Sequence, residues 1–151
     1  MITAREVVEK SYQAVNSGDW ETYLSLYDRN VTSDIANIER NQVIEESTDS
    51  SLEKRREGFD AIKEAVRGIQ EGYSSFQNHP TLMVAEDENV MAISHIEGVT
   101  TSGTKIDGRV AEYFQVRNGK ITAFANWGNS EVFKPFVEQE IPEDRQLKTK
   151  V

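Results

Sequence analysis

The sequence predicts an α+β domain in which helices come first and a curved, mainly antiparallel sheet follows. Apolar residues recur at helical spacing in residues 3–27 and 59–72. Residues 75–129 instead alternate apolar and polar positions, with Asp, Asn and Gly at the turns. Because a long antiparallel sheet wrapped over about three helices leaves one end open, we expect a pocket at that end.

Two short helices in tandem are expected to open the chain. Thr3, with Glu6 three residues later, forms a capping box that begins the first helix. Gly18 permits the left-handed turn that ends it, and Asp19 can cap the second helix. The apolar positions of the two helices are Val8, Tyr12, Val15, Trp20, Tyr23, Leu24 and Tyr27.

The later elements are bounded by turn residues. A third helix begins near Phe59 and stops at Gly72, and Asn118-Gly119 is the strongest hairpin signal. The expected strands are 31–38, 75–86, 90–101, 105–117 and 120–129. Outside them we expect a polar flap or helix at 39–57, a short closing helix at 130–137 and a tail at 138–151. Residues 1–137 would form a single domain.

Composition disfavours several classes of function. The chain of 151 residues carries a net charge of −9, which disfavours binding to nucleic acid or anionic lipid. It has no cysteine, and its two histidines lack metal-ligand spacing, so we expect no disulfide and no metal site. Without a Gly-rich phosphate loop, no cofactor is expected. The absence of an apolar run of roughly 20 residues and of a signal peptide makes a cytoplasmic protein the default.

One carboxylate falls where a core side chain is expected. Strand periodicity places Glu112 on one face with Val110, Phe114 and Val116. An ionised carboxylate on an apolar face is costly unless it is hydrogen-bonded, and otherwise it tends to be protonated. Glu112 is therefore a candidate proton donor in a cavity. The alternatives are a core glutamate satisfied by local partners and an inverted assignment of faces.

A second pair of titratable residues lies on the preceding strand. His95 and Glu97 share a face with Met91, Ile93 and Val99. Facing inward, they would place an acid and a base across one pocket from Glu112. Two inward glutamates would also raise the pKa of one of them. The alternative is an outward pair, or a pair held by structural hydrogen bonds.

Further residues are candidates for the wall of the pocket. Trp127 at the open end would suit a flat apolar ligand, or would be a core or dimer contact. Tyr12 and Tyr23 could point hydroxyl groups inward, with ordinary core positions as the alternative. Phe114 shares the face of Glu112. Asp34 could be an inward acid, with solvent exposure as the alternative.

Four segments together carry a resemblance to a known family. They are Val15-Asn16-Ser17-Gly18-Asp19-Trp20, Leu26-Tyr27-Asp28-Arg29-Asn30-Val31, Gly58-Phe59-Asp60-Ala61-Ile62 and Val116-Arg117-Asn118-Gly119-Lys120-Ile121. Over roughly residues 4–136, their order and spacing resemble the NTF2-like superfamily, in its SnoaL-like and ketosteroid-isomerase-like branches. The resemblance implies a cone of curved sheet and three helices, a pocket at its wide end and a homodimer formed through the sheet.

The resemblance also implies site residues. In the isomerases, an oxyanion-binding tyrosine corresponds to Ser11, beside Tyr12, and a protonated acid corresponds to Glu112. The general base of the isomerases corresponds to Ile35, beside Asp34. The acid of SnoaL-type cyclases, and the second Asp of epoxide hydrolases, falls on Asn129. The Arg-x-Asp portion of the hydrolases falls on His95-Ile96-Glu97.

None of these three sets is complete in this chain, so whether it is an enzyme stays open. The resemblance favours a SnoaL-like protein that binds a small apolar molecule, as an isomerase or cyclase acting by acid–base chemistry on a carbonyl compound. The alternative is a non-catalytic NTF2-like module for ligand binding or dimeric assembly, because fold alone does not determine function.

Overall fold

The computed structural model describes residues 2–34 and 58–128. In this part of the chain three helices and five strands follow one another in the predicted order. The flap at 39–57, the closing helix at 130–137, the tail at 138–151 and Asn129 lie outside the described residues. None of the helices described is long and apolar enough to cross a membrane.

The two opening helices begin at the residues expected to cap them. Helix α1 spans Ala4–Ser17, where the Thr3 hydroxyl accepts a hydrogen bond from the Glu6 amide, and Gly18 ends it at φ 71°. Helix α2 spans Trp20–Ser25 and is capped by Asp19. The expectation that Tyr27 belongs to α2 is wrong. The helix ends at Ser25 because Leu26 already pairs with the sheet, its carbonyl accepting from the amide of Ile121.

The remaining elements follow the sequence pattern, except that β1 begins at Tyr27 rather than at the expected residue 31. Their bounds are β1 Tyr27–Asp34, α5 Gly58–Gly72, β2 Tyr73–Glu86, β3 Asn89–Thr100, β4 Lys105–Arg117 and β5 Lys120–Gly128. The strands form one sheet in the order β1-β5-β4-β3-β2. Strand β1 pairs in parallel with β5, and every other pair is antiparallel. The predicted mainly antiparallel α+β fold is confirmed.

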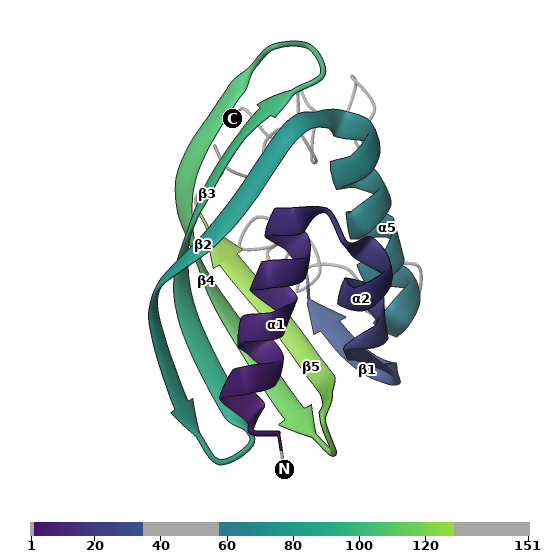
Figure 1. The fold of residues 1–151 in the computed structure, drawn as a ribbon, viewed down its shortest axis with the longest axis vertical. Coiled ribbons are helices and arrows are strands. Elements are labelled where there is room, and N and C mark those ends of the chain that lie inside the picture. Colours follow the sequence, from purple (N-terminus) through teal and green to yellow (C-terminus); the bar gives the residue numbers. More distant parts are fainter. Residues whose placement is uncertain (1, 35–57, 129–151) are drawn as a thin grey trace, which may run out of the picture.

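The sheet is curved, and the helices lie together on one side of it (Figure 1). Burial alternates along the central strands accordingly. On β3 the buried positions are Val90, Ala92, Ser94, Ile96 and Thr100, and on β4 they are Ile106, Val110, Glu112, Phe114 and Val116. This helix-facing side is called the inner face below. Its apolar side chains pack against Val7, Val8 and Ile62 of the helices to form the core.

Helix α5 begins in direct contact with strand β1. Gly58 has φ +63°, and a Cβ atom added to it would lie 2.7 Å from the carbonyl oxygen of Val31. A glycine is required here for two reasons, since side chains disfavour this backbone conformation and the neighbouring backbone leaves no room. The Gly58 carbonyl also accepts a hydrogen bond of 3.4 Å from the Ser33 hydroxyl.

Candidate functional site around Glu112

Glu112 lies on the inner face in the middle of the sheet. In the strand register it stands opposite Ala92 on β3 and Asn126 on β5. Directly opposite residues of antiparallel strands share a face, so these side chains form one row facing the helices. Only 5% of Glu112 is exposed to solvent. The side chain of Glu112 therefore points toward the helices, as strand periodicity predicts.

Three hydrogen-bond donors from three different elements converge on one oxygen of Glu112. Its Oε1 accepts from the Tyr12 hydroxyl of α1 at 2.8 Å and from the Ser94 hydroxyl of β3 at 2.9 Å. The third donor is Nδ2 of Asn78 on β2, at 3.1 Å. The carboxyl group thereby joins the first helix to two strands of the sheet. We call Glu112 and these three donors the Glu112 cluster.

The chemistry of Glu112 is governed by burial without a compensating cation. Burial raises the pKa of this carboxyl above its ordinary value, because the charged form loses its hydration. Surrounding hydrogen bonds act in the opposite direction, in the order Asn78, Tyr12, Ser94 and Asn126. No ion pair among the described residues involves Glu112. The group is therefore held ready to carry a proton at pH values where an exposed glutamate has lost it.

One tyrosine hydroxyl contacts the carboxyl, two more interact with it electrostatically, and all three remain protonated. Burial raises the pKa of Tyr12, and the neighbouring Glu112 raises it further. Burial is also the main cause of the raised pKa values of Tyr23 and Tyr27, whose hydroxyl oxygens lie 2.9 Å apart. These groups can donate or accept hydrogen bonds, but they do not lose a proton near neutral pH.

An aromatic wall adjoins the Glu112 cluster. The ring of Tyr12 meets Phe114 edge-on at 6.0 Å between centroids, and Phe114 lies 5.0 Å from Phe124. Tyr27 contacts Phe124 at 6.2 Å and Tyr23 at 5.1 Å. The predicted wall residues Tyr12, Tyr23 and Phe114 are thus brought together on the inner side of the sheet, next to the buried acid.

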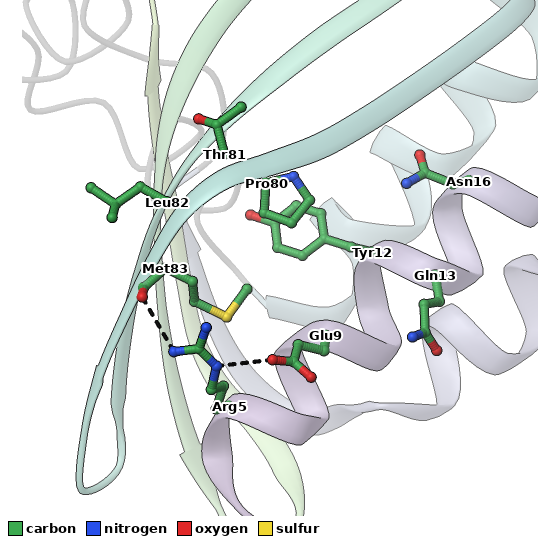
Figure 2. Close-up of a pocket in the computed structure, with 9 residues that line it drawn as sticks. All are labelled: Arg5, Glu9, Tyr12, Gln13, Asn16, Pro80, Thr81, Leu82 and Met83. Atoms are coloured by element: carbon green, nitrogen blue, oxygen red, sulfur yellow. Dashed lines mark hydrogen bonds and ion pairs between the residues drawn. The ribbon is translucent and has the colours of Figure 1, made fainter.

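A groove of about 400 Å³ separates α1 from β2 and reaches the Tyr12 side chain. Figure 2 shows the ring of Tyr12 pointing toward Pro80, with Asn16 at one end of the groove. At the other end Arg5 pairs with Glu9 at 2.9 Å and donates to the Met83 carbonyl at 3.3 Å. The strand register shifts between Pro80 and Leu82, so β2 is irregular where it borders the groove.

The structure corrects the placement of His95 and Glu97. They do share a face with Met91 and Ile93, but it is the outer face, because the alternate residues Ser94 and Ile96 are the buried ones. His95 Nδ1 lies 3.2 Å from Glu97, and its Nε2 is hydrogen-bonded to Asp107. The two residues therefore cannot act across a pocket from Glu112, and the outward alternative applies.

Trp127 also lies on the outer side of the sheet. It stands opposite Ala111, one residue from the inward Asn126, and is half-buried. Trp127 is therefore not part of the wall on the inner side, contrary to the expectation from the sequence. Asp34 ends β1 opposite Ala125, and its side chain is outside the part of the structure described.

Sequence reasoning missed Asn78, Ser94 and Asn126. Each is a buried polar residue, and Ser94 and Asn126 interrupt otherwise apolar alternation on β3 and β5. Polar residues at core-facing positions in three neighbouring strands are a usable signal, because buried polar groups need partners.

Known structures of low sequence identity share this fold. An NTF2-like protein of unknown function from Burkholderia pseudomallei K96243 matches with a TM-score of 0.69 at 13% identity, over 89% of this chain and 97% of that chain. A proposed polyketide cyclase from Xanthomonas campestris pv. campestris matches with a TM-score of 0.66 at 22% identity, over 90% and 95%. An LEH-like epoxide hydrolase from M. tuberculosis matches with a TM-score of 0.64 at 15% identity, over 89% and 90%.

The family relationship rests on the sequence. A comparison with curated proteins finds no match. The family model of the SnoaL-like domain, however, matches residues 8–124. This match runs from the first helix to the last strand and includes every member of the Glu112 cluster. Together with the NTF2-like fold, it shows that the chain belongs to the SnoaL-like domain family.

Proposed function

We propose that this protein binds a small, largely apolar carbonyl compound beside Glu112 and acts on it by acid–base chemistry, as an isomerase or cyclase. The observation that carries the proposal is the Glu112 cluster itself. A carboxyl group without a cationic partner among the described residues sits next to an aromatic wall, with its pKa raised by burial. Apolar surroundings with a few convergent polar groups are typical of small-molecule sites.

The proposed role of Glu112 is that of a hydrogen-bond donor to the ligand. When protonated, its carboxyl can donate to a carbonyl oxygen and stabilise the negative charge that develops there as a solvent water or hydroxide takes the neighbouring C–H proton and an enolate forms. Tyr12, Ser94 and Asn78 keep the carboxyl in place, because all three donate to its Oε1. The aromatic wall from Phe114 to Tyr23 supplies the apolar contacts.

The test is exchange of the protons next to a carbonyl group in heavy water. A panel of small apolar ketones, such as cyclohexenone, tetralone and decalone, is followed by ¹H NMR. We expect the wild-type protein to accelerate exchange for at least one of them. Glu112→Gln should slow this reaction about 100-fold, which is the effect typical of removing one donor to an oxyanion.

Asp107→Asn is the matched control, because it makes the same acid-to-amide change on the outer side of the sheet, where Asp107 contacts His95. This variant should exchange at the wild-type rate. Exchange that is equally fast in Glu112→Gln and the wild type would contradict the proposed role of Glu112. If calorimetry detects no binding of any ketone, the proposal of a carbonyl ligand is wrong.

A second candidate is a non-catalytic ligand-binding module. One observation favours it, because His95 and Glu97 face away from Glu112. The described groups around the carboxyl are Tyr, Ser and Asn side chains, and none of them takes up a proton near neutral pH. Binding of a ketone without any exchange would support this candidate over the enzyme.

We also propose that two copies of the chain associate through the outer face of the sheet. Leu82, Val84 and Met91 are 58%, 59% and 43% exposed, which is unusual for large apolar side chains on adjacent strands. Light scattering at 50 μM concentration should give twice the chain mass of 17.1 kDa. Met91→Lys should shift the population to monomer, whereas Glu21→Lys on α2 should not. A wild-type monomer would contradict this proposal.

A further inference from the structure

Asn16 binds the edge of the sheet through its side chain. Its Nδ2 donates to the carbonyl of Asn78 at 2.9 Å, and its Oδ1 accepts from the amide of Asn78 at 2.7 Å. In the described residues β2 is the edge strand of the sheet, and the Asn16 side chain makes the pair of bonds that a neighbouring strand would make. A third bond, from Gln77 Nε2 to the Asn16 carbonyl at 3.1 Å, holds the same junction.

The contact between Asn16 and Asn78 involves a residue that is itself a donor to Glu112. The backbone of Asn78 faces Asn16, while its side chain reaches inward and donates to Glu112 at 3.1 Å. Within the described chain, the other side-chain atom of Asn78, Oδ1, is buried and has no hydrogen-bond partner. The direction of the Asn78 amide is therefore set by its bond to Glu112 and by the backbone position that Asn16 holds.

Beyond Asn78, strand β2 loses its close hydrogen-bonded contact with α1. Pro80 has no amide hydrogen, the register shifts between Pro80 and Leu82, and the groove opens between helix and strand (Figure 2). Apart from the 3.4 Å contact between Asn16 Nδ2 and His79 Nδ1, the next hydrogen bond from α1 to β2 among the described residues is the one from Arg5 to the Met83 carbonyl, 3.3 Å. Asn16 is thus the anchor of β2 nearest to the Glu112 cluster.

We infer that Asn16 is a positioning residue that, through the backbone of Asn78, holds an amide donor on Glu112 and so controls how readily Glu112 releases its proton. The inference about the proton of Glu112 does not need the proposed function. Only an effect of Asn16 on the rate of ketone exchange would rest on it. The inference also gives a physical role to the asparagine of the Asn16-Ser17-Gly18-Asp19 segment. Gly18 ends α1 and Asp19 begins α2, while Asn16 binds α1 to the sheet.

Among the described residues, the ionisable groups to consider near this junction are three tyrosines and one histidine. Tyr12 of α1, Tyr23 of α2 and Tyr27 of β1 interact electrostatically with Glu112 and stay neutral. His79 Nδ1 lies 3.4 Å from Asn16 Nδ2. Titrations are therefore made in a His79→Gln background as well, so that a change at Glu112 is not a response to the charge of His79.

The experiment is a titration of the Glu112 side-chain carboxyl by ¹³C NMR, assigned with Glu112→Gln and made without any ligand. Asn16→Leu keeps the size of the side chain and removes both bonds to Asn78. We expect it to raise the titration midpoint by about half a pH unit to one unit, as expected for weakening one hydrogen bond to the charged form. Asn16→Ser, which retains a hydroxyl, should give a smaller rise and serves if the leucine variant does not fold.

A double-mutant cycle distinguishes an effect of Asn16 that acts through the Asn78 donor from a general loss of structure around Glu112. Asn78→Ala removes the donor itself and should raise the midpoint at least as much as Asn16→Leu. In the Asn78→Ala background, Asn16→Leu should add no further shift. Thr81→Ala, which removes a bond of 3.1 Å between β2 and β3, should leave the midpoint unchanged.

Two results would overturn the inference: an unchanged midpoint in Asn16→Leu, or an equal rise in the presence and absence of Asn78. Because no ligand is used, these outcomes are independent of whether the proposed function is correct. If ketone exchange is absent but the cycle behaves as expected, the proposed function fails and the positioning role of Asn16 stands.

Discussion

Glu112→Leu is expected to lower the free energy of unfolding by about 3–5 kcal/mol. Leucine cannot accept a hydrogen bond, so Tyr12, Ser94 and Asn78 would be left as three buried donors around an apolar side chain. Each unsatisfied buried donor costs about 1–3 kcal/mol, and the removal of a poorly hydrated carboxyl offsets part of the total. Urea unfolding at pH 7, followed by circular dichroism, measures the loss.

Glu112→Gln is the matched control, because its amide oxygen can accept the same three bonds. Burial places the pKa of Glu112 in the folded protein above the value of 4.5 that an ordinary glutamate has. The folded state then binds the proton more tightly than the unfolded state. The stabilisation from this proton is complete below the ordinary value and is lost as pH rises through the raised one.

The wild type should therefore lose stability relative to Glu112→Gln as the pH rises above 4.5 and through the raised pKa of Glu112, since the glutamine cannot titrate. A leucine variant as stable as the glutamine variant at pH 5 would mean that the three hydrogen bonds contribute little to folding. A difference between wild type and Glu112→Gln that is independent of pH would contradict the raised pKa.

Gly58→Val is expected to lower the free energy of unfolding by about 3 kcal/mol or more. The backbone conformation at φ +63° disfavours a β-branched side chain by about 1–2 kcal/mol, and its Cβ would lie 2.7 Å from the Val31 carbonyl oxygen. Strand β1 and helix α5 would have to move apart. The same urea titration measures the effect.

Gly18→Val isolates the conformational part of this cost. Gly18 has φ +71°, and nothing lies within 4 Å of a Cβ atom placed there. This variant should lose only about 1–2 kcal/mol. If the two valine variants were equally destabilised, the close approach of Gly58 to β1 would have no energetic consequence.

Local signals in the sequence predict most of the described fold, because caps and turns act over a few residues. Thr3, Gly18 and Asp19 bound the first helices where expected. Tyr27 was misassigned to α2 because its place is decided by pairing between β1 and β5, in which it stands opposite Ile121. That pairing joins segments almost a hundred residues apart, and periodicity within a helix carries no information about it.

The candidate site is only half predictable for a related reason. A period of two correctly separates Glu112 from its neighbours, and it correctly groups His95 with Met91 and Ile93. It cannot say which group faces the helices when both contain apolar residues, and Met91 and Ile93 made the outer face of β3 look like core. The partners Asn78 and Ser94 depend in turn on the register across strands.

The contact between Asn16 and Asn78 also bears on how the protein behaves in concentrated solution. A terminal strand with free amide and carbonyl groups offers a template for cross-β aggregation. On β2 one such pair is already occupied by Asn16, the carbonyl of Met83 is bonded to Arg5, and Pro80 has no amide hydrogen to offer. These contacts and Pro80 leave fewer free backbone groups on β2 to which an added strand could pair.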